Sequence, residues 1–306
     1  MKFNFQLPVQ AQSTMFAEAW EASGGRDAII AIARAADESG FYAIAACEHV
    51  AVPPHRAETM GRTWADPIAV LSLCAGVTER VQLMTYVYVL ALRHPLMAAK
   101  ALSTLDWLSN GRLIVGVGAG HVEEEFAALG VDFSTRGTRL SQSIDAVRQC
   151  FVNDLPALDA PFESAPMYLY PRAKRTPPIL VAGSTSAAVK RAAKHGDGWL
   201  AQGPATPELL SILSDSRIAA GRADEPFEIG HIAGFVHVGE PTWDVGAHVL
   251  SGTPEHIATT LAERMPQGAT MCQVMFRSRS AEELAEQVRL FGTTVATHES
   301  LSGASA

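Results

Sequence analysis

The stretch from residue 81 to residue 120 most constrains the fold, because it contains a strand, a helix and a second strand in succession. Residues 81–89 form a β-branched and aromatic run that is too short to span a membrane. Pro95 stands at the tolerated first turn of a helix, and Asn110-Gly111 supplies its end. Leu113–Val117 then reads as the second strand. One complete βαβ unit predicts a parallel sheet.

The same alternation runs through the rest of the chain. Strands are predicted at 3–7, 41–47, 81–89, Leu113–Val117, Ile179–Ala182, 198–201, 229–238 and Met271–Phe276, with helix-spaced sequence after each. Eight such pairs are the number in a (β/α)8 TIM barrel, an α/β fold, although spacing alone does not exclude a doubly wound open sheet.

The domain organisation predicted from this pattern is one barrel domain over residues 1–306. Residues 153–177 contain five prolines and no clear periodicity, so they are interpreted as a proline-rich inserted excursion. Residues 239–252 are predicted to be a loop, and a tail at about 298–306 is predicted to fray.

Composition narrows the range of functions. The net charge of −8 argues against nucleic acid and anionic membranes as main partners. The first residues lack an apolar core of signal-peptide length, and no apolar run is long enough for a membrane helix, so a cytoplasmic protein is expected. The four scattered cysteines are expected to be core thiols. No H-x-H or H-E-x-x-H pattern occurs, so no metal site is predicted.

In a barrel the active site lies at the carboxyl ends of the strands, and that rule selects the candidate residues. Glu48-His49 follows the second strand, and a histidine there can donate or accept a proton near neutral pH. The alternative is a histidine bonded to a neighbouring carbonyl, with Glu48 solvated. Met15, Phe16, Trp20 and Trp64 lie in loops that could wall a substrate pocket or pack elsewhere.

Two glycine-containing strand ends are further candidates. Gly118 and Gly120 stand with Ala119 after the fourth strand, but the glycine spacing does not match the G-x-G-x-x-G of a dinucleotide fold. Ala182-Gly183-Ser184-Thr185 has the form of a phosphate site, because a strand ends there and a new helix begins. Simple N-capping by Ser184 or Thr185 is the alternative that needs no ligand.

Three long segments resemble the luciferase-like monooxygenase superfamily. They are TYVYVLALRHP (85–95), TLDWLSNGRLIVGVGAG (104–120) and EEFAALG (124–130), and the likeness covers roughly residues 1–280. Within the superfamily, the chain is more similar to the oxidoreductases that use the deazaflavin coenzyme F420. The resemblance points to the barrel rather than the open sheet.

The resemblance also implies roles for individual residues. It places a catalytic acid–histidine pair at Glu48 and His49, with His49 moving the proton and Glu48 orienting it. It implies a bulge with a non-prolyl cis peptide between Tyr86 and Val87 behind the cofactor ring, although the family prefers a small residue where Tyr86 stands.

Cofactor contacts follow from the same likeness. Gly118, Ala119 and Gly120 would lie near the ring, and Ala119 stands where bacterial luciferase has a phosphate-binding arginine. Ala182, Gly183, Ser184 and Thr185 would hold the cofactor phosphate. His121 is a candidate for lining the site, and a surface position at the start of a helix is the alternative. Asp197 matches the family too and is interpreted as structural. The basic residues Arg172, Lys174 and Arg175 read as a solvated loop or a contact for the acidic tail of F420.

The leading hypothesis is an oxidoreductase that transfers a hydride between F420 and a small organic substrate. The alternatives are an FMN-dependent monooxygenase with a partner flavin reductase, and a non-catalytic protein that binds a flavin or deazaflavin. A homodimer is expected, as is usual in the family.

Overall fold

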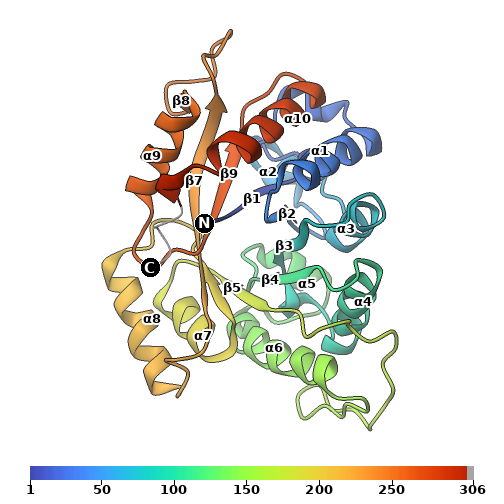
Figure 1. Ribbon diagram of the computed structural model, residues 1–306. Coiled ribbons are helices and arrows are strands. Elements are labelled where there is room, and N and C mark those ends of the chain that lie inside the picture. The colour runs from blue at the N-terminus through green and yellow to red at the C-terminus, as the bar shows by residue number, and fades with distance from the viewer. Residues whose placement is uncertain (302–306) are drawn as a thin grey trace.

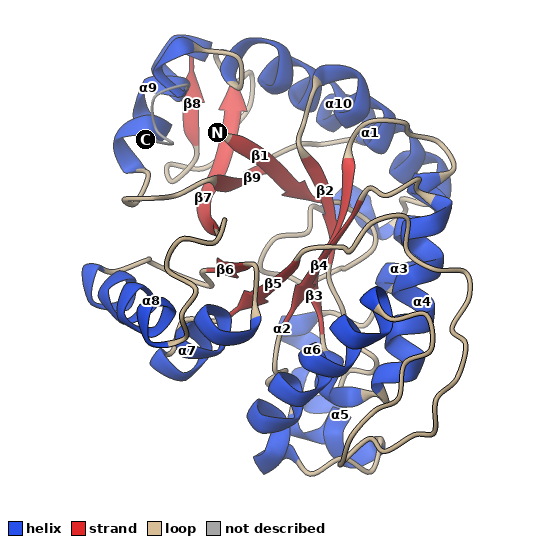
Figure 2. Ribbon diagram, turned by 60° about the horizontal axis from the view of Figure 1, so that its bottom comes forward, coloured by secondary structure: helices blue, strands red, loops and turns tan. Residues whose placement is uncertain are grey.

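The computed structural model describes residues 1–301 and shows a closed ring of eight parallel strands surrounded by helices (Figures 1 and 2). The ring consists of β1 (Lys2–Gln6), β2 (Ala43–Ala46), β3 (Gln82–Tyr88), β4 (Leu113–Val117), β5 (Ile179–Ala182), β6 (Gly198–Leu200), β7 (Glu228–Val238) and β9 (Met271–Phe276). Neighbours follow the order β6-β5-β4-β3-β2-β1-β9-β7, and β6 pairs with β7 to close it. The predicted TIM barrel is confirmed, and the open sheet is excluded.

The helices lie outside this ring, one or more after each strand (Figure 2). They are α1 (Arg26–Ser39), α2 (Ala57–Met60), α3 (Pro67–Ala75), α4 (Pro95–Leu108), α5 (Glu123–Ala128), α6 (Arg136–Val152), α7 (Ser186–His195), α8 (Pro207–Ala219), α9 (Pro254–Arg264) and α10 (Ala281–Leu290). The start of α3 shows how the sequence sets such boundaries. Pro67 takes the first helical position, and the Asp66 carboxylate accepts the Ala69 N–H at 2.9 Å.

Alternate residues along the strands divide the core into two parts. The outward residues pack with the helices in one large cluster. The inward residues form a smaller cluster that fills the lumen: Ala43, Ala45, Met84, Tyr86, Ile114, Leu180, Ala182, Leu200 and Met271. The four cysteines are free thiols and buried, which confirms the prediction of core thiols.

Two predictions of irregular structure are wrong. Within the predicted loop 239–252, Leu250–Gly252 forms a further strand, β8, which pairs with the far end of β7. Strand β7 runs past the barrel, and its exposed edge offers backbone groups that β8 satisfies. At the end of the chain, 298–301 does not fray, because Leu301 is buried and Glu299–Leu301 forms a 3₁₀ turn. The rest of the predicted tail lies outside the described residues.

The excursion at 153–177 contains no helix or strand and runs along the lower right edge in Figure 1. Its basic residues lie at the wrong end of the barrel for the cofactor tail. Arg175 donates to the carbonyl oxygens of Gly111 and Leu113 and to the side chain of Gln82, at the amino ends of β3 and β4. Arg172 pairs with Asp154 in the excursion itself. A contact from this cluster to the tail of a cofactor at the carboxyl face is not supported.

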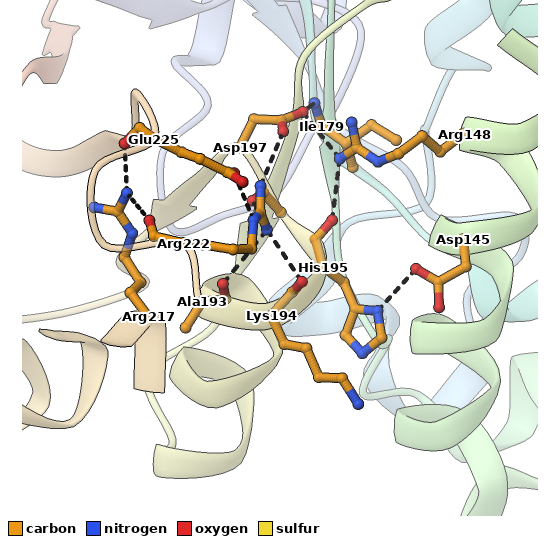
Figure 3. A network of polar contacts seen from close by, with 11 residues as sticks. Asp145, Arg148, Ile179, Ala193, Lys194, His195, Asp197, Arg217, Arg222 and Glu225 are labelled. Atoms are coloured by element: carbon orange, nitrogen blue, oxygen red, sulfur yellow. Dashed lines mark hydrogen bonds and ion pairs between the residues drawn. The ribbon is translucent and has the colours of Figure 1, made fainter. Parts of the chain in front are cut away.

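Asp197 joins β5, α6 and α7 at the amino face of the barrel (Figure 3). Its Oδ2 atom accepts the Ile179 N–H at 2.8 Å and pairs with Arg148 at 3.0 Å. Arg222 reaches its other oxygen at 3.5 Å and donates to the carbonyl oxygen of Gly196 at 2.7 Å. These bonds satisfy the carbonyl end of α7 and the start of β5, as the structural interpretation of Asp197 predicts.

Candidate active site

His49 lies three residues beyond β2, at the carboxyl face of the barrel. Its Nδ1 atom is 2.8 Å from Oε2 of Glu125, a residue in the first turn of α5. The other carboxylate oxygen, Oε1, accepts the backbone N–H groups of Val50 at 2.6 Å and Ala51 at 3.3 Å. The Glu125 carboxylate therefore fixes both the imidazole ring and the backbone that follows it.

The charge state of this pair decides which nitrogen is available for chemistry. The side chains of His49 and Glu125 are 11% and 5% exposed. Burial acts to raise the pKa of Glu125, but the hydrogen bond and charge of His49 and the two backbone N–H groups outweigh it, so that pKa is lowered. An ionised carboxylate only accepts, so Nδ1 of His49 carries the hydrogen. Nε2 is left to take or give a proton.

The lowered pKa of Glu125 has a consequence for stability. A carboxyl group whose pKa is lower in the folded state adds stability above its ordinary pKa. That contribution is lost as the pH falls through the folded-state pKa. The hydrogen bonds of Glu125 to His49 and to the backbone are therefore expected at neutral pH and are lost in strongly acidic solution.

Two aromatic rings flank His49. The ring centroids of Trp64 and His121 lie 4.5 Å and 5.3 Å from the centroid of the His49 ring, both edge to face. Trp64 is held by a hydrogen bond from Nε1 to the carbonyl oxygen of Met60 at 3.1 Å. Burial, and then the charge of His49, lower the pKa of His121. His121 thus lies against His49, where the sequence analysis expects a residue that lines the site.

Glu48 takes a different part from the one expected of it. Its carboxylate binds Arg93 with both oxygens, at 2.9 Å and 2.5 Å, and accepts the Val89 N–H at 2.7 Å. Glu48 and His49 therefore have separate partners, although they are adjacent in the sequence. Within residues 1–301 the carboxylate bonded to His49 is that of Glu125, which the sequence analysis missed. Glu48 instead ties the end of β2 to the segment after β3.

The expected bulge is present in β3. The Tyr86–Val87 peptide is cis, and β3 shifts its register against β4 at this point. Gly118 packs against it, since a Cβ at this position would lie 2.7 Å from a methyl carbon of Val87. The Tyr86 hydroxyl accepts a hydrogen bond from Gln202 at 3.1 Å inside the lumen, and burial raises its pKa. The large side chain is therefore accommodated within the barrel.

The segment after β5, residues 183–185, leads into the first turn of α7. Thr185 is the N-cap of α7, and its hydroxyl accepts the Ala188 N–H at 3.2 Å. Gly183 has φ +142°, and its carbonyl oxygen accepts the indole N–H of Trp199 at 2.7 Å. Ser184 and Thr185 are both exposed. The capping alternative is thus correct for Thr185, and it leaves other N–H groups of the first turn free for an anion.

The carboxyl face brings most of the predicted cofactor residues together. Tyr86 and Ala182 share the lumen cluster, and Val87 packs against it. Ala119 and Gly120 are partly buried after β4, where Gly120 takes a left-handed backbone with φ +79°. In the described part of the chain, no group of three or more His, Cys, Asp or Glu side chains is placed to hold a metal ion.

A family model described as luciferase-like monooxygenase matches residues 1–249. The chain belongs to this family. Residues 1–301 contain no helix with the length and apolar character needed to cross a membrane.

Two relatives in the luciferase-like family carry names that include a cofactor. The F420-dependent glucose-6-phosphate dehydrogenase of Amycolatopsis mediterranei is 31% identical over 185 residues, which cover 59% of this chain and 54% of that protein. The F420-dependent hydroxymycolic acid dehydrogenase of Mycobacterium tuberculosis is 29% identical over 217 residues, covering 67% and 57%.

Solved structures show the same fold. A monooxygenase from Streptomyces bottropensis superposes with a TM-score of 0.77 at 24% identity and covers 97% of this chain and 99% of its own. The oxygenating constituent of 3,6-diketocamphane monooxygenase from Pseudomonas putida, in complex with FMN, gives a TM-score of 0.74 at 15% identity, covering 97% and 98%. At these identities the likeness concerns the fold alone.

Proposed function

We propose that this protein is an oxidoreductase that transfers a hydride between F420 and a small organic substrate, with His49 as the proton donor or acceptor. The observation that carries the proposal is the bond between Nδ1 of His49 and Glu125, which leaves Nε2 free at the carboxyl face of the barrel. The two relatives named as F420-dependent dehydrogenases support the choice of cofactor.

The residues at the carboxyl face fit a flat ring with a phosphate. Gly118 and the bulge at Tyr86-Val87 give a close-packed backbone surface without a side chain at 118. The start of α7, beside Gly183 and Ser184, supplies N–H and hydroxyl groups for the phosphate. A bound F420 would supply the hydride acceptor or donor.

A residue of the protein would transfer the proton. When an alcohol is oxidised to a carbonyl compound, a hydride leaves the carbon and the hydroxyl proton must go to a base. Nε2 of His49 takes that proton, and Glu125 stabilises the imidazolium that results. In the reverse direction the same nitrogen returns the proton to the carbonyl oxygen.

The FMN-dependent monooxygenase with a partner reductase remains the second candidate, because the fold is shared with a flavin-bound monooxygenase. The third candidate is a protein that binds a flavin or deazaflavin without turnover. The expected homodimer and the cytoplasmic location stay predictions.

A paired titration tests the cofactor. Purified protein is titrated with F420 and with FMN, and binding is read from quenching of cofactor fluorescence. We expect saturable binding of F420 and at least about tenfold weaker binding of FMN. Tight binding of FMN alone would replace the proposal with the monooxygenase. Binding of neither would reduce the segment 183–185 to a helix cap.

Replacing Glu125 by glutamine tests its positioning role. The amide has one acceptor oxygen for the three donors that now share the carboxylate, so the imidazole loses its fixed orientation. We expect kcat to fall by about 10- to 100-fold with little change in F420 affinity, and the pH–rate profile to change shape. Steady-state kinetics across pH measure this.

The conservative variant Glu125→Asp keeps the carboxylate and should recover part of the rate. A loss of rate in Glu125→Gln with an unchanged pH profile, or no recovery in Glu125→Asp, would indicate a purely structural residue.

A further inference from the structure

Two arginines lie close together where the start of α6 meets α7. Nε of Arg191 donates to the carbonyl oxygen of Gly137 at 3.1 Å and to the hydroxyl of Ser141 at 3.0 Å. Arg136 donates to the carbonyl oxygen of Phe133 at 3.0 Å, and its guanidinium carbon lies 3.9 Å from the centroid of that ring. In the part of the chain that the structure describes, every hydrogen bond of these two arginines therefore goes to an uncharged oxygen.

The two positive charges act on each other. Burial, and then the charge of Arg136, lower the pKa of Arg191. A Cβ at Gly137 would lie 2.8 Å from Nη2 of Arg191, so the absence of a side chain lets the guanidinium lie against the backbone of α6. The Nη atoms of Arg191 make no hydrogen bond to the described residues and stay open to solvent. In a chain with a net charge of −8, two adjacent cations of this kind favour an anion with several negative charges.

This arginine pair lies near the carboxyl face, beside the expected phosphate site. Arg136 is the first residue of α6, and Arg139 in the same turn donates to the carbonyl oxygen of Ala91 at 2.7 Å, in the segment that follows β3. Arg191 lies about 7.5 Å along the axis of α7 from the first residue of that helix. Side chains in a helix lean toward its N-terminus, which in α7 is the end beside residues 183–185. A chain that extends from an anion bound there could therefore reach both guanidinium groups.

We propose that Arg136 and Arg191 bind the acidic tail of F420. The proposal rests on the function proposed above, because it takes F420 as the cofactor. The tail is a chain of glutamates joined to the phosphate, so its carboxylates begin where the phosphate is held. A guanidinium donates two parallel hydrogen bonds to a carboxylate, and two neighbouring guanidinium groups suit the repeated carboxylates of such a chain. FMN has no such tail, so this pair would also favour F420 over FMN.

Removing the glutamates from the cofactor tests the contact in the wild-type protein. The protein is titrated at low and at high ionic strength with F420 that carries several glutamates, and with the same cofactor after its glutamates have been removed. Binding is read from quenching of cofactor fluorescence. At low ionic strength we expect the tailed form to bind at least about fivefold more tightly, and at high ionic strength the difference should shrink because salt screens exposed charges. Equal affinity for the two forms at low ionic strength overturns the proposal.

The double variant Arg136→Gln, Arg191→Gln assigns the preference to these residues. Glutamine keeps an amide donor for the neighbouring oxygens and removes the charge. We expect this variant to bind the two forms of F420 equally, with the affinity for the tail-free form within about twofold of wild type. Lys194→Gln is the matched control and should keep the preference, because Lys194 is an exposed cation in the last turn of α7, away from the carboxyl face.

Two results would remove the two arginines from the contact. One is a double variant that keeps the full preference for the tailed form, and the other is an equal loss of preference in Lys194→Gln. If the double variant does not fold, Arg136→Gln alone decides, because this half-buried side chain should account for part of the preference.

The same titrations separate failure of the tail contact from failure of the proposed function. Binding of both forms of F420 with equal affinity would overturn the tail contact and keep the proposed function. Binding of neither form, or of FMN alone, would overturn the proposed function and the tail contact with it.

Discussion

Replacing His49 by alanine should abolish most turnover while leaving F420 bound. Nε2 of His49 is the nitrogen left free by Glu125, and general acid–base groups contribute about 10²- to 10⁴-fold to rate. We expect kcat to fall by that range in an assay that follows F420 absorbance with small alcohols as substrates. The F420 dissociation constant should change little, because the expected phosphate and ring contacts lie after β5 and in β3.

The fold should survive this change. In His49→Ala the Glu125 carboxylate still accepts hydrogen bonds from the N–H groups of Val50 and Ala51, so it is not left without partners. His55→Ala is a matched control, since this second histidine lies on the same loop with a 65% exposed side chain. We expect it to retain the wild-type rate within about twofold. A rate in His49→Ala equal to that of His55→Ala would remove His49 from the mechanism.

The barrel can be predicted from the sequence because strands that are buried on both faces appear as near-continuous apolar runs. Every residue of β4 and β5 is buried, and each strand stands out in the sequence against the helix-spaced segments that follow it. Strand β8 was missed because three half-buried residues carry no period, and its pairing depends on how far β7 extends. The packing of Leu301 depends likewise on contacts distant in sequence.

The sequence predicts where the candidate site lies in the barrel, but not which side chain is hydrogen-bonded to His49. The ends of the predicted strands located His49 and Gly183, because the active site of a barrel lies at the carboxyl ends of its strands, and the family resemblance placed Tyr86. Glu125 follows Glu123 and Glu124, and three acidic residues at a helix start are explained by the helix dipole alone. Which of the three points toward His49 depends on the rotation of α5 about its axis. Three consecutive glutamates in the sequence do not show which of them faces His49.

Removing Arg93 should cause the largest loss of stability among the changes considered. The Glu48 carboxylate, with a side chain 3% exposed, would keep the Val89 N–H and lose its only ionic partner among residues 1–301. Breaking a buried ion pair from one side costs about 3–5 kcal/mol. We expect the free energy of unfolding of Arg93→Ala, measured by urea denaturation, to fall by that amount. F420 affinity should fall as well, because Arg93 also donates to the Val89 carbonyl oxygen at 3.1 Å, beside the bulge.

Two comparisons test whether the loss of stability in Arg93→Ala comes from the Glu48 carboxylate that is left without an ionic partner. Adding Glu48→Gln to Arg93→Ala removes the buried charge and should restore more than half of the lost stability, because an uncompensated charge costs more than a missing pair. Arg289→Ala removes a cation from an exposed pair with Glu38 and should cost less than about 1 kcal/mol. If the double variant were no more stable than Arg93→Ala, the loss would come from the packing of the arginine over the Tyr88 ring, 4.0 Å away. The ion pair with Glu48 would then be an incidental contact.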